Sequence, residues 1–374
     1  MAGARGFGFQ VPAKPAPLDG VVNLDDFEPI ARERLDPRAY GYYASGAGAE
    51  RSLHDNVASW SAWRLLPRVL SGSRAPETSV RLLGGSAALP FGVAPAALQG
   101  MAHPDGELAM ARAATGHGVP YVLSTASTRT IEEVAAAAGS EAAGPRWFQL
   151  YVEHDLGFAR ELVLRAEAAG FTAVVLTVDL PVAGYRERDI RNRLAIPMSV
   201  QAHLPAGLAE GETEFTTYID TKPELRWADV EAIAGWSSLP LVVKGILAPR
   251  DVERAADHGA AAVWVSNHGG RQLDGSVTAA EMLAEAVDAA AGRVEIYADG
   301  GIRRGSDILV ALALGARAVF IGRPFLYALA TAGEAGVEHA IAILGDELRR
   351  SLSILGATAV TDVRREHLRP AIVP

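Results

Sequence analysis

Residues 239–271, LPLVVKGILAPRDVERAADHGAAAVWVSNHGGR, decide the fold class of this chain. Two short apolar runs, 241–243 and 262–265, have the length and the β-branched content of buried strands. The segment 250–257 between them has the apolar spacing of a helix. Two buried strands joined by a helix are typical of a parallel sheet, because parallel strands need a crossover connection of this kind. The stretch therefore predicts one βα unit and the strand of the next.

The same unit recurs eight times along the chain. The predicted strands cover residues 90–94, 121–123, 147–150, 173–176, 241–243, 262–265, 295–298 and 318–321. The predicted helices cover residues 107–115, 131–137, 157–169, 227–234, 250–257, 279–290, 306–313 and 325–332. Eight consecutive units favour an α/β protein with a closed (β/α)8 TIM barrel over an open doubly wound sheet, in which the strand order normally reverses.

The segments that flank the barrel have a different character. Residues 1–22 contain Gly and Pro without a clear period, and we expect a flexible N-terminal arm there. Residues 24–35 are predicted to be helical, with Asn23 as the N-cap. Residues 337–355 are predicted to form a closing C-terminal helix.

An irregular segment, residues 195–226, interrupts the fourth unit. Long loops in compact barrels usually cover the active site, so we predict that this one is a lid. With 374 residues, the chain has the length of one α/β barrel. We therefore expect residues 23–374 to form one domain that contains the lid.

Composition argues against several classes of protein. The net charge of -9 describes an acidic surface, which repels nucleic acid and anionic lipid. The chain has no cysteine, which excludes disulfides, thiolate metal sites and cysteine nucleophiles, and no metal site is predicted. No apolar run is long enough for a signal peptide or a membrane span. We expect a cytoplasmic protein that binds neither nucleic acid nor membrane and borrows a cofactor for any redox chemistry.

Polar or glycine-rich residues end nearly every predicted strand, although the strands themselves are apolar. They are Ser124, Gln149 with Tyr151, Thr177 with Asp179, Lys244, Ser266 to Arg271, Asp299 to Arg303, and Gly322 with Arg323. The carboxyl ends of the strands meet at one face of such a barrel, where barrel enzymes carry their active sites. Any one of these clusters could be ordinary loop chemistry, but their shared position predicts an active site.

Lys244 stands out because the chain has only three lysines beside 32 arginines. An ammonium group at the end of an apolar strand needs an anionic partner to offset its desolvation. A salt bridge to a core carboxylate would provide one. A cofactor atom that becomes negative during turnover fits the position better.

The motif SNHGGRQLDG places His268 and Arg271 directly after a strand. His268 could act as a general base and Arg271 as a ligand for a carboxylate. A single histidine is more often structural than catalytic. Here Asp179 ends another strand and could fix the imidazole tautomer and stabilise its charged form, which favours the catalytic interpretation.

Two glycine-bearing turns, ADGGIRRG and IGRPF, follow the last two predicted strands. Barrel enzymes often bind phosphate there through main-chain N–H groups and a helix N-terminus. Arg303 and Arg323 would add charge-assisted bonds. The two turns together imply a phosphorylated ligand. The sequence GAGAE at residues 46–50 does not match a dinucleotide fingerprint, because no strand precedes it and the third glycine is absent.

These motifs are also those of a known family. From about residue 24 to about residue 355, the sequence resembles the FMN-dependent 2-hydroxy-acid oxidases and dehydrogenases, which include glycolate oxidase, lactate oxidase, mandelate dehydrogenase and hydroxymandelate oxidase. The motifs YYASGA, APAALQGMAHPDGE, FQLYV, LTVDLP with RERDIRNR, LVVKG, SNHGGRQLDG, DGGIRRG and IGRP occur in the family's order. The resemblance implies an enzyme that uses FMN to oxidise a 2-hydroxy acid to a 2-oxo acid, and a homotetramer.

The resemblance also implies roles for individual residues. His268 is the active-site base, Asp179 its partner, and Lys244 the cation that offsets negative charge on the reduced flavin. The substrate's carboxylate and hydroxyl are bound by Tyr42, Tyr151, Arg186 and Arg271. The residues that surround the flavin and ribityl parts of FMN are Pro95, Ala96, Ala97, Ser124, Gln149, Thr177, Lys244 and Ser266. The residues that hold the ribityl and phosphate end are Asp299, Gly300, Gly301, Arg303, Gly322 and Arg323.

Two departures from the family's pattern bear on the reaction. Ala126 stands where glycolate oxidase-like members have a tryptophan, which favours a substrate larger than glycolate, although His203 or Leu204 of the predicted lid could refill the space. Ala97 stands where some dehydrogenase and monooxygenase relatives have glycine, which favours an oxidase that reduces O2 to H2O2. A dehydrogenase that passes electrons to a quinone or carrier protein, and a non-redox flavin-dependent isomerase, are the alternatives.

Overall fold

The computed structural model describes residues 7–72, 75–139, 143–152, 156–197, 200–204, 214–215 and 224–371. Eight parallel strands form one closed barrel, which confirms the predicted fold class. In the order in which they pair, the strands are β4 (Phe91–Val93), β5 (Tyr121–Ser124), β6 (Arg146–Leu150), β7 (Ala173–Thr177), β10 (Leu241–Ile246), β11 (Ala262–Val265), β12 (Glu295–Asp299) and β13 (Ala318–Ile321). Each predicted strand overlaps one of them.

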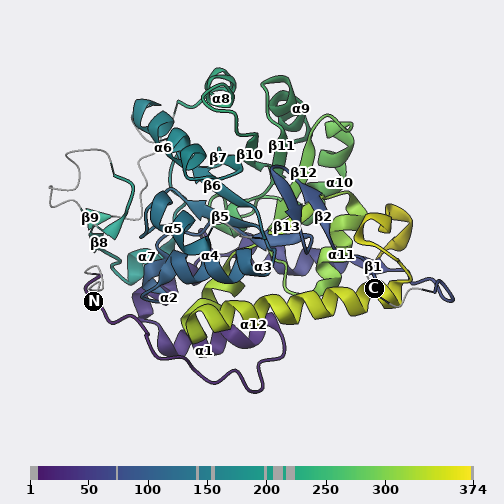
Figure 1. Ribbon diagram of the computed structural model, residues 1–374, viewed down its shortest axis with the longest axis horizontal. Helices are drawn as coiled ribbons and strands as arrows, with labels where there is room; N and C mark the ends of the chain where they lie inside the picture. Colours follow the sequence, from purple (N-terminus) through teal and green to yellow (C-terminus); the bar gives the residue numbers. More distant parts are fainter. Residues whose placement is uncertain are drawn as a thin grey trace.

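Helices surround the barrel on its outside (Figure 1). They are α4 (Gly106–Gly116), α5 (Ile131–Ala138), α6 (Leu156–Ala168), α8 (Trp227–Ala234), α9 (Pro249–Asp257), α10 (Ala279–Ala290), α11 (Gly305–Leu314) and α12 (Arg323–Leu355). Within α12 the backbone of Ala332 and Gly333 is not helical, so this element is two helices that meet at the kink. The kink lies between the two helices that the sequence predicted, 325–332 and 337–355.

Large aromatic side chains fill the barrel beneath its carboxyl-terminal face. Trp147, Trp264, Tyr297 and Phe320 are fully buried and pack on one another, with the Trp264 and Phe320 ring centroids 4.0 Å apart. The opposite end is covered by a hairpin of β2 (Val80–Leu82) and β3 (Gly85–Ala87), whose apolar residues join the same cluster. Close packing of this kind resists deformation and gives the residues above it a rigid base.

Short helices before the barrel were largely missed by the sequence analysis. The predicted helix 24–35 is present as η1 (Leu24–Asp26) and α1 (Phe27–Arg34), and Asn23 caps it as predicted. The unpredicted elements are α2 (Pro37–Ala44), α3 (Arg51–Ala58), η2 (Ser59–Ala62) and β1 (Trp63–Leu65), which pairs with β14 (Leu368–Pro370). The remaining short helices are η3 (Gln99–Met101), η5 (His268–Gly270), η6 (Val360–Asp362) and η7 (Arg365–His367).

The segment α2–α3 packs over the loops that follow β11 and β12. The Trp60 indole N–H donates to the Gly300 carbonyl at 2.8 Å. The buried amides of Asn56 and Asn267 bond to each other reciprocally, at 2.9 Å in both directions. A side chain on Gly301 would lie 1.7 Å from the Asn56 carbonyl oxygen, so only glycine permits this approach. The chain before the barrel thus becomes part of the carboxyl-terminal face.

The flexible arm predicted for residues 1–22 stays a prediction, and its residues 1–6 lie outside the described residues; residues 7–22 are described. This part has no helix or strand, but Phe7 and Val21 are each 5% exposed and join the main apolar core. The Ala16 N–H also donates to the Thr331 carbonyl at 2.8 Å. Burial of these apolar side chains places this part of the segment against the barrel.

The predicted lid is described only in part. After β7 the chain forms α7 (Glu187–Arg191) and two short paired strands, β8 (Ile196–Pro197) and β9 (Glu214–Phe215). Residues 198–199, 205–213 and 216–223 of the predicted lid lie outside the described residues. Within the described part of the chain, no helix is long and apolar enough to cross a membrane.

Candidate active site

A cavity of about 1110 Å³, including the space at its mouth, opens at the carboxyl ends of the barrel strands. The predicted site residues that line it are Tyr42, Pro95, Ala96, Ala97, Ser124, Tyr151, Arg186, Lys244, His268, Arg271, Asp299, Gly300, Gly301, Arg303, Gly322 and Arg323. The structure therefore brings together residues that the sequence places as far as 281 positions apart.

A row of buried polar side chains follows the ends of β5, β6 and β7. The Ser124 hydroxyl donates to Gln149 Oε1 at 3.1 Å, and Gln149 Nε2 donates to Thr177 Oγ1 at 3.1 Å. Strand register produces this row, because Ser124 pairs with Gln149 and Thr177 pairs with Lys244 on the next strand. The row presents hydroxyl and amide groups of fixed orientation beside the Lys244 ammonium.

The hydroxyl of Ser266 connects three functional groups. It accepts from Lys244 Nζ at 3.2 Å and from the His268 main-chain N–H at 3.0 Å, and it donates to Asp299 Oδ1 at 2.6 Å. Lys244 also lies 3.5 Å from Asp299 Oδ2, and both side chains are nearly buried. The core carboxylate that the sequence analysis considered as a partner for Lys244 therefore exists, and it is Asp299. Because both Lys244 and Asp299 also line the cavity, a ligand can contact either.

His268 and Asp179 form the dyad that the motifs predicted. His268 Nδ1 lies 2.9 Å from Asp179 Oδ1, and Nε2 lies 3.4 Å from the Tyr151 hydroxyl. Gly245, with φ of +105°, allows this pairing, because a side chain there would lie 2.6 Å from Asp179 Cβ. With Nδ1 donating to the carboxylate, Nε2 is the atom that can take a proton.

The surroundings of the dyad keep the imidazole neutral and the carboxylate ionised. Burial lowers the pKa of His268, and Lys244 lowers it further, while Asp179 opposes both. Burial alone would raise the pKa of Asp179, but the nearby His268 and Lys244 hold it below its ordinary value. A neutral imidazole supported by an ionised carboxylate is the form that a general base requires.

Two guanidinium groups face the same tyrosine from different elements. Arg186 lies 5.7 Å and Arg271 lies 5.1 Å from the centre of the Tyr42 ring. Arg186 is also 3.3 Å from the fully buried Asp189 carboxylate. Burial, followed by the charge of Arg186, lowers the pKa of the Arg271 guanidinium to about 9. The excess of positive charge indicates a site for an anion such as a carboxylate.

The residues predicted to bind phosphate also line the cavity. Gly322, Arg323 and Pro324 line it where α12 begins, and a helix N-terminus favours anions. Arg303 also lines the cavity and lies 3.2 Å from the exposed Asp25 carboxylate. FMN needs hydrogen-bond donors for its flavin and ribityl parts and cations for its phosphate. The site offers hydroxyl and amide groups, an ammonium and two guanidinium groups. The residues present therefore fit FMN.

Four predicted residues contribute without lining the cavity, and a fifth does not contact it. Asp179, Gln149 and Ser266 each bond to a lining side chain, and Thr177 bonds to Gln149. Ala126 is buried and is absent from the residues that line the cavity, so its predicted effect on substrate size stays a prediction.

His203 does not fill space beside the substrate in the structure. Its Nδ1 lies 2.9 Å from the Thr125 carbonyl, and its Nε2 accepts from the Ile131 N–H at 3.1 Å. Its ring packs edge-on against Phe148, with centroids 6.0 Å apart. Burial lowers the pKa of His203 to about 4. The side chain therefore anchors residues 200–204 to the barrel as a neutral imidazole.

Several residues of the site were not predicted from the sequence. They are Tyr43, Ser45, Leu180, Ala183, Asp189 and Gln272. Gln272 follows Arg271 in a motif already noted, and its amide donates to the Asp179 carbonyl at 2.7 Å while its oxygen accepts from the Gly184 N–H at 3.2 Å. Gln272, Leu180 and Asp189 lie inside the motifs SNHGGRQLDG, LTVDLP and RERDIRNR, and this position was the available signal for them.

Comparisons with known proteins agree with this geometry. The family described as FMN-dependent dehydrogenase matches residues 31–370. An L-lactate oxidase of Nostoc sp. is 45% identical over 355 residues, which are 92% of this chain and 97% of that protein. Glycolate oxidase 1 of Oryza sativa subsp. indica is 41% identical over 356 residues, 93% of this chain and 95% of its own. A crystal structure of mandelate oxidase is 43% identical, covers 94% of this chain and 99% of that one, and has a TM-score of 0.86. The chain therefore belongs to the FMN-dependent dehydrogenase family, as its motifs predicted, and FMN is its cofactor.

Proposed function

We propose that this chain oxidises an (S)-2-hydroxy acid larger than glycolate to the 2-oxo acid, with O2 reduced to H2O2. One observation carries the proposal: the His268–Asp179 dyad, two guanidinium groups and the Lys244 ammonium face one cavity. Lactate oxidase, glycolate oxidase and mandelate oxidase are among the proteins to which the chain is similar. The net reaction is balanced, because the substrate loses two electrons and two protons and O2 gains both.

The protein's own groups account for substrate binding and proton transfer. Arg186 and Arg271 bind the substrate carboxylate, and Tyr42 lies between them. This orientation brings the substrate hydroxyl towards His268 Nε2 and the Tyr151 hydroxyl, which lie 3.4 Å apart. His268 takes the hydroxyl proton, and Asp179 stabilises the resulting imidazolium. Bound FMN would supply the acceptor for the α-hydrogen and for the electron pair of the α-carbon's C–H bond that breaks.

Lys244 and the cavity wall support the remaining parts of the proposal. The Lys244 ammonium offers positive charge where the cofactor gains electrons, and Asp299 holds it in place. The small or aliphatic residues Ala97, Leu180 and Ala183 line the cavity and leave an apolar surface for a substituent on the substrate's α-carbon. An aliphatic or aromatic side chain fits that surface better than the hydrogen of glycolate.

The test is an anaerobic screen in which both enantiomers of a series of 2-hydroxy acids are mixed with the yellow holoenzyme. We expect (S)-enantiomers of lactate or larger acids to bleach the flavin faster than glycolate does. Bleaching by glycolate alone contradicts the proposed substrate size, and bleaching by none of the acids contradicts the reaction. Stopped-flow mixing of the reduced enzyme with O2 then tests the acceptor, since negligible reoxidation removes the oxidase proposal and leaves a dehydrogenase.

Assembly and cellular location belong to the same proposal. The resemblance supports a homotetramer, and light scattering of the purified holoenzyme measures its mass directly. Cytoplasmic residence stays a prediction from composition, and cell fractionation tests it.

A further inference from the structure

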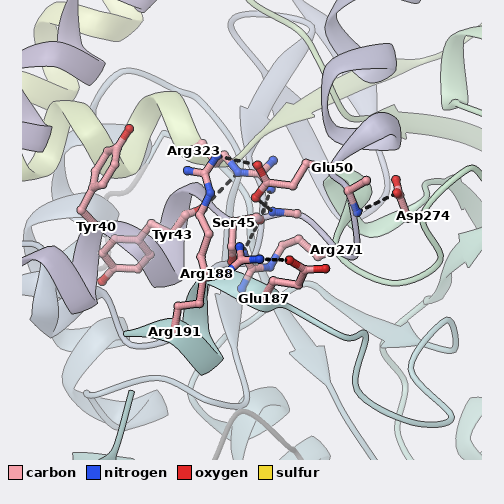
Figure 2. A network of polar contacts seen from close by, with 12 residues as sticks. Tyr40, Tyr43, Ser45, Glu50, Glu187, Arg188, Arg191, Arg271, Asp274 and Arg323 are labelled. Carbon is pink, nitrogen blue, oxygen red and sulfur yellow. Dashed lines mark hydrogen bonds and ion pairs between the residues drawn. The ribbon is translucent and has the colours of Figure 1, made fainter. Parts of the chain in front are cut away.

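The carboxyl end of α2 lies between two partly buried guanidinium groups (Figure 2). Arg271 Nη1 donates to the carbonyl oxygens of Tyr42 and Ser45, both at 2.8 Å. Arg323 Nε donates to the Tyr43 carbonyl at 3.0 Å, and Arg323 Nη2 donates to the Ser45 carbonyl at 2.9 Å. The last carbonyls of a helix have no partners within the helix, so these two cations satisfy them and stabilise the helix dipole.

The Ser45 carbonyl is the point that the two arginines share. Ser45 is fully buried and ends α2 as its C-cap. Arg323 Nη2 also donates to the carbonyl of Gly269 at 3.0 Å, next to the proposed base His268. One guanidinium group therefore joins the end of α2 to the loop that carries the base.

Each guanidinium group keeps N–H donors for a ligand. A guanidinium has five N–H donors, and both arginines line the cavity. Among the described residues, the bonds of Arg323 to α2 and to Gly269 use Nε and Nη2, which leaves Nη1 for the phosphate end of the cofactor. The bonds of Arg271 to α2 use Nη1, which leaves Nε and Nη2 for a carboxylate.

We propose that the end of α2 couples the two halves of the site, and that Arg323 is a positioning residue for substrate binding as well as a ligand of the cofactor. An anion at Nη1 fixes the Arg323 guanidinium, which fixes Ser45, and Ser45 in turn holds Arg271 beside Tyr42. Cofactor binding thereby orders the site of the substrate carboxylate. This inference rests on the proposed function in one respect, the assignment of Arg271 to the carboxylate.

The experiment compares Arg323→Lys with Arg303→Lys in the full-length, FMN-loaded protein. Both substitutions keep a charge at the phosphate end, but Arg303 bonds to Asp25 and to its neighbour's carbonyl rather than to α2. Both should weaken FMN binding. With FMN saturating, only Arg323→Lys should weaken binding of the 2-oxo acid product, measured from its perturbation of the flavin spectrum. We expect about 10-fold or more, the effect of losing one charge-assisted hydrogen bond, against about 2-fold or less for Arg303→Lys.

Hydrogen exchange provides a readout that does not depend on turnover. The amides of residues 40–46 should exchange faster in Arg323→Lys than in Arg303→Lys. In the wild-type protein they should exchange faster when FMN is removed, a comparison that remains valid if the variant folds poorly. The proposal would be overturned if the two substitutions weakened product binding equally. It would also be overturned if the amides of residues 40–46 exchanged at the same rate with and without FMN. Failure of the wild type to bind any 2-oxo acid refutes the proposed function instead, and the exchange data still test the coupling.

Discussion

Replacing Asp179 by Asn tests whether the carboxylate stabilises positive charge on His268. The substitution keeps the size of the side chain and an oxygen that can accept from Nδ1, now 2.9 Å from the carboxylate, but it removes the charge. A charge-assisted hydrogen bond contributes about 1.5–3 kcal/mol, and two unit charges about 4 Å apart interact by about 4 kcal/mol at an effective dielectric constant of about 20. Loss of about 3–4 kcal/mol from the transition state predicts a fall in kcat of roughly 100- to 1000-fold.

The pH profile gives the same substitution a second, independent readout. Asp179 raises the pKa of His268, so its removal lowers that pKa further. Since the base acts in its neutral form, the acid limb of kcat/KM should move to lower pH in the variant. The assay is the rate of anaerobic flavin reduction from pH 4 to pH 9, with FMN content checked first; saturating substrate gives the limiting rate, and low substrate concentrations give the kcat/KM profile. Asp274→Asn is the matched control, because Asp274 accepts from the Ala49 and Ser52 main chain and has no contact with His268. A rate within about 3-fold of the wild type and an unmoved limb would refute the proposed role of Asp179.

Three further predictions follow from neighbouring groups. Gly245→Ala places a side chain 2.6 Å from Asp179 at a φ of +105°, so we expect loss of about 2 kcal/mol or more of unfolding free energy and a lower kcat, measured by urea unfolding and flavin reduction. Burial lowers the pKa of His203 from 6.5 to about 4, so below pH 6.5 the unfolded chain takes up a proton that the folded protein does not. The free energy of unfolding should therefore fall by about 2 kcal/mol between pH 7 and pH 5. His203→Gln should remove this pH dependence from the urea unfolding midpoints, and the same dependence in the variant would contradict the prediction. Lys244→Met leaves Asp299 buried without its cation and should cost about 3–5 kcal/mol of stability, part of which the double variant with Asp299→Asn recovers; additive losses would argue against the pairing.

The barrel could be predicted from sequence because each of its units is local. The strand Ala262–Val265 and the helix Ala279–Ala290 have the predicted bounds. Buried strands are short apolar runs, and surface helices repeat apolar residues every three or four positions, so both patterns can be recognised in a short stretch of sequence. The helices α2 and α3 were not predicted because they precede the repeated βα units, whose alternation of strand and helix guided the prediction. Their stability comes from tertiary contacts, although Asp36 as N-cap and Pro37 in the first turn were signals that could have been used for α2.

The site shows the same division between local and distant information. Motifs placed His268, Asp179 and Lys244 at the ends of strands, and barrel geometry then brought them to one face. What the sequence could not indicate is which partner each polar group takes. Asn56 and Asn267 are 211 positions apart and bond to each other. Arg323 was assigned only to the phosphate end of the cofactor, but its Nε and Nη2 also donate to the carbonyls of Tyr43 and Ser45. Such pairings depend on loop paths that no periodicity encodes.

The distribution of charge explains why this face needs its ligands. The cations that line the cavity are Arg186, Lys244, Arg271, Arg303 and Arg323. The carboxylates that pair with them or with the dyad are Asp25, Asp179, Asp189 and Asp299. Asp179 is committed to His268, so Arg271 and Arg323 are stabilised chiefly by neutral carbonyls, and burial lowers the pKa of both. Two anions in the cavity, the phosphate of the cofactor and the carboxylate of the substrate, would relieve that imbalance. Binding of either ligand should therefore stabilise the fold as well as the reaction, since a ligand that binds only the folded state adds to its stability.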